Sequence, residues 1–245
     1  MPSQNLVICA CPKCGSTSLF NMIYEQTFDK DWDMENCKAD PQAIASNCWQ
    51  GLLQDQDHLT DKIMNESFSF AVIRDPIERL VSVWKSKLAC DGFRYGELPE
   101  EKEHKLRRVQ TLLRLAGRDS NASCLAIDEF ANALIDVKQK GRQADLNPHM
   151  KPQSYFCFAR YPPSAWSKIV QLSEADAFTS LAKHLGSTTK NTLRPRSHAS
   201  TSAVQIKRET FSKLATVAED EYAFLGKYSK TRSTVKAGSR VFTLS

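Results

Sequence analysis

The sequence predicts a single α/β domain in which a mostly parallel sheet lies between layers of helices. The apolar run Leu6–Ala10 ends in a loop marked by Pro and Gly, and Ser16 then offers an N-cap to a helical pattern. The aromatic and β-branched run 67–73 likewise leads into a helix that begins with Pro76. A third short run, 167–172, is followed by an acidic turn and another helical pattern. Repeated strand, loop and helix units of this kind build α/β domains.

Length and composition agree with one domain. The chain has 245 residues, and 41% of them are hydrophobic, which is enough for a sizeable core. We expect the folded domain to span residues 1–228, followed by a flexible basic tail rich in Ser and Thr at 229–245. Between these limits, the apolar spacing predicts helices over 101–116 and 127–140 and a final helix that contains Phe211 to Leu225.

The net charge of the chain indicates which classes of ligand and partner to expect. The formal net charge of +5 is a mild excess that suits an anionic ligand. Nucleic acid is not expected as a partner, because the sequence has no dense Lys/Arg tract and no Cys/His finger spacing. No apolar stretch approaches the roughly 18 residues needed to span a membrane, and the first strand begins almost at once. We therefore expect no membrane segment and no signal peptide in this chain.

The loop after the first strand has the chemistry of an anion site. It combines Lys13 and Gly15 with the hydroxyl groups of residues 16–18, at the start of a helix. The unpaired N–H groups and the positive end of the dipole at a helix N-terminus favour an anion. The order of residues differs from the nucleotide loop G-x-x-x-x-G-K-[ST], because here Lys comes first.

The second strand ends in a similar arrangement. Asp75 is a good N-cap for a helix with Pro76 at its first position and Glu78 at its third. Arg74 therefore projects from the carboxyl end of a strand, which is where open α/β sheets bind ligands. Ser82 follows about two turns along the helix, and guanidinium and hydroxyl groups are both good donors to phosphate.

Taken together, the two stretches resemble the sulfotransferases that use 3′-phosphoadenosine 5′-phosphosulfate (PAPS), whose fold is similar to that of P-loop NTPases. The first resembles the 5′-phosphosulfate loop of that family. The second resembles its 3′-phosphate motif through Arg74, Asp75, Pro76, Arg79, Leu80, Ser82 and Lys85. The resemblance implies that the donor is bound by Pro12, Lys13, Cys14, Gly15, Ser16, Thr17, Ser18, Arg74, Ser82 and Arg196, the last in a basic loop that closes over it.

A third stretch, residues 145–157, contains two prolines that force an extended path. It resembles an element of the Golgi carbohydrate sulfotransferases that modify chondroitin and dermatan, with Asn147 and Met150 replacing the usual Asp and aromatic residue. His149 is one candidate for the general base, because imidazole has a suitable pKa. The other candidate is His58, which lies between the two donor motifs, where related enzymes often place their base.

Eight cysteines show no clear disulfide pattern. Cys9, Cys11 and Cys14 lack a second pair of ligand spacing, so we expect no metal. The resemblance implies an enzyme that transfers a sulfuryl group from PAPS to a hydroxyl of a glycan or a small metabolite. A P-loop-type kinase or nucleotide phosphotransferase and a non-catalytic nucleotide-binding module are the alternatives. The expected location is the cytoplasm, and a Golgi lumenal domain whose anchor has been removed is the alternative.

Overall fold

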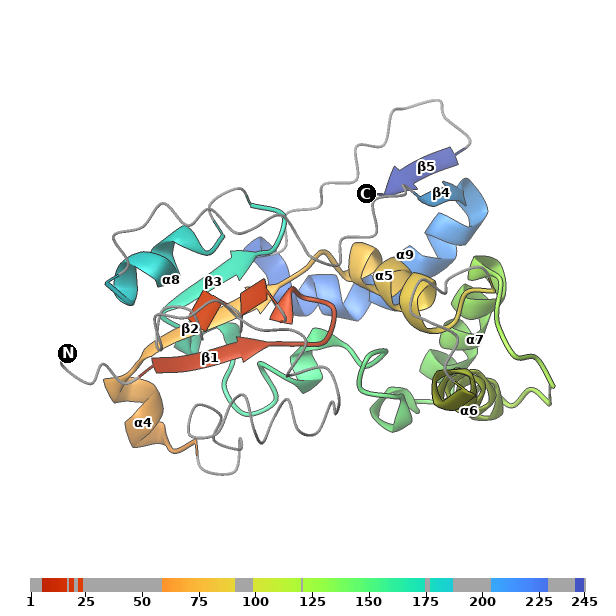
Figure 1. Ribbon diagram of the computed structural model, residues 1–245, viewed down its shortest axis with the longest axis horizontal. Coiled ribbons are helices and arrows are strands. Elements are labelled where there is room, and N and C mark those ends of the chain that lie inside the picture. Colours follow the sequence, from red (N-terminus) through yellow and green to blue (C-terminus); the bar gives the residue numbers. More distant parts are fainter. Residues whose placement is uncertain are drawn as a thin grey trace.

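The computed structural model describes residues 6–16, 18–19, 22–23, 59–90, 99–119, 121–174, 177–186, 204–228 and 241–244. Its centre is a parallel sheet in the order β1 (Leu6–Ala10), β2 (Phe68–Ile73) and β3 (Lys168–Gln171), as Figure 1 shows. The register pairs Ile8 with Phe70 and Val72 with Val170. The predicted α/β class, with a parallel sheet flanked by helices, is confirmed.

Helices cover both faces of the sheet because the side chains of β2 are apolar on both sides. Phe70 and Val72 pack on one face with Leu19 of the helical segment after β1 and with Leu181 of α8 (Thr179–His184). Ala71 and Ile73 belong to a second cluster on the other face, which contains Met64 of α4 (Asp61–Glu66) and the end of α9 (Arg208–Leu225). A strand buried on both faces in this way is typical of parallel sheets.

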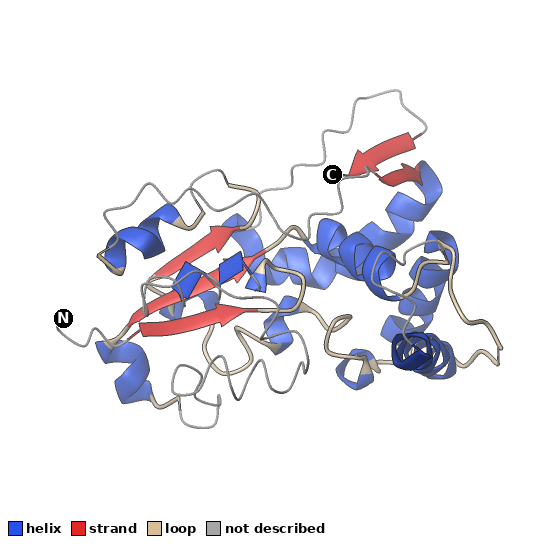
Figure 2. Cartoon of the chain, in the orientation of Figure 1, coloured by secondary structure: helices blue, strands red, loops and turns tan. Residues whose placement is uncertain are grey.

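The largest core cluster lies beside the sheet, between four helices (Figures 1 and 2). These are α5 (Pro76–Lys87), α6 (Pro99–Ala116), α7 (Ile127–Gln139) and α9. The predicted start of α5 is confirmed, since Asp75 Oδ1 accepts a hydrogen bond of 3.0 Å from Glu78 N. The predicted helices at 101–116, 127–140 and the end of the domain correspond to α6, α7 and α9. None of the helices in the described ranges is long and apolar enough to cross a membrane.

Short 3-10 turns connect these helices to the sheet. They are η2 (Gln143–Asp145), η3 (Gln153–Tyr155), η4 (Pro163–Ala165) and η5 (Gly226–Tyr228). Antiparallel strands β4 (Val204–Lys207) and β5 (Val241–Leu244) form a separate two-stranded sheet. Strand β5 lies inside the segment 229–245 that the sequence predicts to be a flexible tail, so these four residues are paired instead. The division at residue 228 otherwise stays a prediction.

The cysteines correct one expectation, since disulfides are present although the spacing gave no sign of them. Cys9 of β1 is bonded to Cys157, and Cys90 is bonded to Cys124. Cys11 is bonded to Cys14 across the loop after β1. The first two pairs join positions far apart in the chain, which only the folded backbone brings together, so spacing cannot reveal them. Cys9 itself is half-buried rather than fully buried.

Candidate active site

The loop after β1 has a backbone that few residues tolerate. Lys13 has a φ of 71° and Gly15 a φ of 78°, both in the left-handed region. Cys14 N donates to Cys11 O at 3.0 Å, and Leu19 N donates to Gly15 O at 3.0 Å to start the helix. A Cβ at Gly15 would lie 2.6 Å from Leu172 Cδ1. Glycine therefore lets the loop pack against the end of β3.

Lys13 stands in this loop among other cations. Its pKa is lowered to about 8, first by burial and then by the positive charges of Lys87, Arg74 and Arg108. Mutual repulsion of this kind makes the charged form of Lys13 costly until an anion arrives. A lysine with a strongly shifted pKa beside several cations is typical of a functional anion site.

Arg74 brings the two donor motifs together. It follows the last residue of β2, and its Nη1 donates to the backbone oxygen of Lys13 at 3.4 Å. Its Nε pairs with Glu78 Oε2 at 3.5 Å, one turn along the chain. Ser82 is half-buried further along α5. The carboxyl ends of β1 and β2 thus present the first loop and Arg74 at one edge of the sheet.

The segment that carries His149 begins with a tight turn. Asn147 Oδ1 accepts a hydrogen bond of 3.1 Å from His149 N, and Met150 N donates to Asn147 O at 2.7 Å. An Asn side chain that bonds to the backbone two residues later forms an Asx turn, as Asp does. Met150 is buried in the helical core. Asn147 and Met150, which replace the Asp and the aromatic residue of the family pattern, therefore still stabilise the fold of this segment.

Arg79 stabilises the backbone of this segment through hydrogen bonds. Its side chain is completely buried, and its guanidinium donates to His149 O at 3.0 Å and to Lys151 O at 2.5 Å. Its Nη2 also lies 3.9 Å from Glu221 Oε2 on α9. Burial lowers the pKa of Arg79, and Glu221 opposes that effect. Arg79 thus has a structural role within the 3′-phosphate motif, since it fixes the backbone that carries His149.

Gln153 connects the remaining parts of the site. Its amide clamps the backbone of Arg74, with Nε2 donating to Arg74 O at 2.9 Å and Oε1 accepting from Arg74 N at 2.8 Å. Its own N and Nε2 both donate to Glu221 Oε1, at 2.9 and 2.6 Å. Gln153 Oε1 also lies 3.0 Å from Cys14 Sγ, which contacts it without a proton while the sulfur is bridged. One side chain therefore joins β2, the first loop and α9.

His149 is half-buried at the edge of this network. Its pKa is lowered to about 4, mainly by burial and then by the charges of Lys87, Lys13 and Arg108, with a smaller effect from Arg79. Its Nδ1 is buried and has no hydrogen-bond partner among the described residues. The imidazole is therefore neutral at pH 7, and it lies within electrostatic reach of Lys13.

The structure brings Lys13, Arg74 and His149 into one site, with Cys14 and Gly15 in its first loop. Among the other predicted residues, Pro12, Ser16 and Ser18 are half-buried in or just after that loop. Thr17, His58 and Arg196 lie outside the described residues, so their roles stay predictions.

Sequence reasoning missed three residues. Lys87, rather than the predicted Lys85, is the lysine of α5 that lowers the pKa of Lys13 and His149, and Arg108 of α6 acts with it. Lys87 lies three residues after Trp84, which is the position of the lysine in the family pattern R-D-P-x-x-R-L-x-S-x-[YW]-x-x-K, so counting along this pattern could have identified it. Glu221 is a carboxylate within the apolar stripe of α9, between Ala218 and Leu225. A charged residue in such a stripe needs a buried partner, so the position of Glu221 in the apolar pattern could have indicated one.

A loop with a lysine at a helix N-terminus, beside an arginine at the carboxyl edge of a parallel sheet, is an arrangement of α/β proteins that is suited to an anionic ligand. Residues 1–233 match the model of the Sulfotransferase family, and the chain belongs to this family of sulfuryl transferases. Comparisons with curated proteins and with solved structures found no significant match.

Proposed function

We propose that the chain transfers a sulfuryl group from PAPS to a hydroxyl group of an acceptor and releases adenosine 3′,5′-bisphosphate. The observation that supports this most directly is the contact between Arg74 Nη1 and the backbone oxygen of Lys13. It brings the motif for the 5′-phosphosulfate and the motif for the 3′-phosphate to one edge of the sheet. The residues present fit such a donor, because they combine a helix N-terminus, a lysine and an arginine.

Each donor-binding residue has a distinct task. When bound, PAPS would supply the sulfuryl group, and its 5′-phosphate would be the leaving group, which stays on the released adenosine 3′,5′-bisphosphate. Lys13 neutralises negative charge that grows on this phosphate, an interaction that is stronger in the transition state than in the ground state. The N–H groups of residues 14–17, with the hydroxyls after Gly15, hold the 5′-phosphate, and Pro12 sets the path of the loop. Arg74 and Ser82 hold the 3′-phosphate, and Arg196 adds a cation above the donor.

His149 accepts the proton of the acceptor hydroxyl. Its neutral imidazole is ready to take a proton, although a pKa of about 4 makes it a weak base. The anionic charge of the donor opposes the effect of Lys13, Lys87 and Arg108, and so raises this pKa toward the working pH. The base therefore becomes stronger when the donor is in place. His58 is the alternative base.

The acceptor we propose is a glycan, since residues 145–157 resemble the element of Golgi carbohydrate sulfotransferases; a small metabolite is the alternative. The disulfides Cys9–Cys157 and Cys90–Cys124 favour the Golgi lumen over the cytoplasm, because such bonds persist in oxidising compartments.

The competing function is that of a P-loop-type kinase or another nucleotide phosphotransferase. Against it, Lys13 precedes the glycine of the loop, and Arg74 is suited to a phosphate that ATP lacks. A binding module without catalysis would use the same loop, but Lys13→Ala would then cost it affinity and no turnover.

Calorimetric titration with adenosine 3′,5′-bisphosphate, ADP and AMP tests the donor. We expect the bisphosphate to bind best to the wild type, and Arg74→Ala to remove that preference. Arg142→Ala is the matched control, since Arg142 pairs with Asp145 at the surface. Equal or tighter binding of ADP would overturn the proposal in favour of a phosphotransferase. Turnover of labelled PAPS with glycan acceptors then tests the reaction itself.

A further inference from the structure

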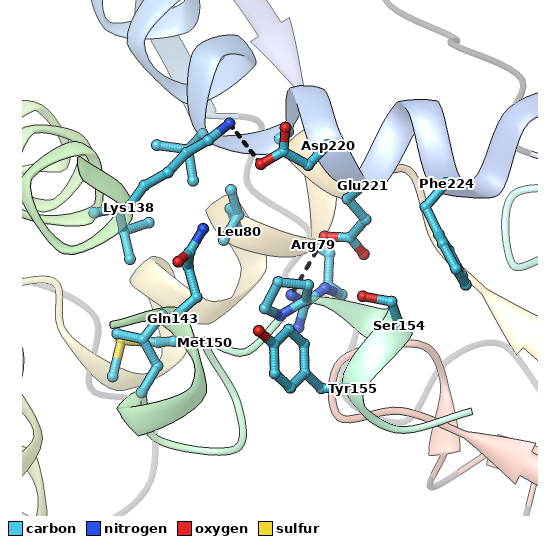
Figure 3. Close-up of a pocket in the computed structure, with 15 residues that line it drawn as sticks. Arg79, Leu80, Lys138, Gln143, Met150, Ser154, Tyr155, Asp220, Glu221 and Phe224 are labelled. Atoms are coloured by element: carbon cyan, nitrogen blue, oxygen red, sulfur yellow. Dashed lines mark ion pairs between the residues drawn. The ribbon is translucent and has the colours of Figure 1, made fainter. Parts of the chain in front are cut away.

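A cavity of about 250 Å³ lies between α5, α7 and α9, on the side of the helical core (Figure 3). One wall is the segment of the chain that follows His149, through Met150, Pro152 and Ser154. Gln153, between two of these residues, contacts Arg74 and Cys14. The cavity and the candidate active site therefore share the segment 149–155 as a common wall.

Two exposed aromatic side chains border the cavity. Tyr155 has 46% of its surface exposed and Phe224 has 41%, and among the described residues these are the large hydrophobic side chains that the fold leaves exposed. Tyr155 comes from η3 and Phe224 from α9. Aromatic faces carry partial negative charge and pack well against C–H groups, so each of these rings can contact a ligand ring that presents C–H bonds.

The charges around the cavity are balanced. Lys138 Nζ pairs with Asp220 Oδ2 at 3.0 Å, and Arg79 Nη2 lies 3.9 Å from Glu221 Oε2. Figure 3 shows both ion pairs beside the same space, with the amide of Gln143 and the hydroxyl of Ser154. Paired charges give no net attraction for an ion but remain good partners for hydroxyl groups. In contrast, the groups that act on Lys13 are all cationic.

One donor at this cavity lacks a partner. Arg79 Nε is buried and makes no hydrogen bond to any described residue, although the guanidinium is otherwise fully used. A buried N–H group without an acceptor is costly, so an oxygen is expected near it. A ligand that combines hydroxyl oxygens with an apolar ring face would use the polar groups of Gln143 and Ser154 and cover Tyr155 at once.

We propose that this cavity binds a neutral sugar ring, either a hexose or an N-acetylhexosamine, as a second unit of the acceptor beside the unit that carries the reacting hydroxyl. The assignment of the ring to the acceptor rests on the proposed function, whereas the sugar site itself rests on the cavity. A phenol would use the aromatic surface and leave the polar groups unused. A uronate would bring a charge that the paired side chains do not attract.

Saturation-transfer NMR on the full chain tests this site with the methyl glycosides of galactose and N-acetylgalactosamine, with glucuronate and phenol as comparison probes. Variants Tyr155→Ala and Phe224→Ala remove the aromatic surface. Tyr161→Ala is the matched control, because Tyr161 bonds to Asp61 outside this cavity. Titration with adenosine 3′,5′-bisphosphate on every variant reports the donor site independently.

We expect a neutral glycoside to bind the wild type and Tyr161→Ala alike, and its dissociation constant to rise about tenfold or more in the two cavity variants, with unchanged bisphosphate binding. Absence of transfer from both neutral glycosides, equal transfer in all variants, or preference for phenol or glucuronate would overturn the proposal. Sugar binding without bisphosphate binding would support the cavity and contradict the proposed donor. A disaccharide acceptor whose KM rises in Tyr155→Ala at unchanged kcat would support its assignment to the acceptor.

Discussion

Two segments contribute to the candidate site, and they hold their shape in different ways. The loop after β1 is fixed locally, by the left-handed backbone at Lys13 and Gly15 and by hydrogen bonds that span three or four residues. The segment 147–153 has one local turn, and otherwise depends on Arg79 of α5 and Glu221 of α9. Local geometry therefore fixes the proposed donor loop, whereas the position of the proposed base depends on contacts made far away in the chain.

This difference distinguishes a residue proposed to act on the ligand from a residue that holds the site in place. Lys13 has a shifted pKa and lies in a loop that its own backbone holds in shape, so its replacement should remove charge at the site with little effect on folding. Glu221 is buried and accepts bonds from Gln153, so its replacement should disturb several site residues at once. The predictions below use this contrast.

The largest effect is expected for Lys13→Ala. Turnover should fall by about 10² or more, because a positioned charge on the leaving phosphate is lost. Lys62→Ala on α4 is the control, since Lys62 is exposed. Steady-state kinetics with labelled PAPS measures the effect, beside thermal unfolding that should hardly change. Turnover close to that of the wild type would remove Lys13 from the mechanism.

Glu221→Gln should affect stability and activity together. It leaves Arg79 as a buried charge without its counterion, and breaking such a pair costs about 3 kcal/mol. The new amide keeps one oxygen for the bonds from Gln153, but these bonds lose the strength that the carboxylate charge gives them, and the NH2 group faces Arg79. Turnover per folded molecule should fall by on the order of tenfold as Gln153 and His149 shift.

A nearby residue provides the control for this variant. Glu219→Gln makes the same chemical change on the same helix, but Glu219 is exposed and does not line the cavity, so its replacement should change stability and turnover little. Urea unfolding and turnover normalised to the bisphosphate-binding fraction measure both variants. Equal effects of the two substitutions would show that the buried network does not position the site.

The sequence predicted the parts of the protein that local patterns determine. The start of α5 is set by Asp75 and Pro76, and the apolar spacing of α7 and α9 identifies their buried faces. The conformation of the loop around Lys13 is likewise determined by residues that are adjacent to it in the sequence. In each of these cases the physical cause and the residues that it acts on lie within one or two turns.

The parts that sequence reasoning missed depend on contacts between distant residues. No local rule pairs Cys9 with Cys157 or Gln153 with Glu221, because their proximity results from the packing of α9 and the sheet. Arg79 was expected as part of a phosphate motif, but burial directs it to His149 O instead. The spacing of a motif identifies its residues, and only their surroundings show which of them can reach a ligand.

Gly15→Ala tests whether local backbone geometry fixes the loop after β1. Gly141 has a similar φ of 65° with open space around its Cα, so Gly141→Ala carries the backbone strain of about 1 kcal/mol without a clash. At Gly15, the new Cβ would also displace Leu172. We expect both variants to lose similar stability, and bisphosphate affinity to fall about tenfold only in Gly15→Ala. Unchanged affinity would show that the loop adapts.

The smallest expected effect is the pH dependence of affinity for the bisphosphate. Lys13 has a pKa of about 8 in the free protein, and a bound anion stabilises its charged form, so binding must take up a proton where Lys13 is neutral. Affinity for the bisphosphate is then nearly fully present at pH 7 and declines as the pH rises through 8 and above. The charged fraction predicts a loss of about fourfold between pH 7 and pH 8.5.

Calorimetry in buffers of different ionisation enthalpy measures this proton uptake directly. Lys13→Met is the control, since an uncharged side chain of similar length should bind more weakly but with nearly constant affinity over the same range. In the free protein His149 has a pKa of about 4 and is neutral over this range, and any proton that it takes up on binding would also be taken up in Lys13→Met. A decline that persists in Lys13→Met would assign the titration to another group and would place Lys13 outside the contact with the donor.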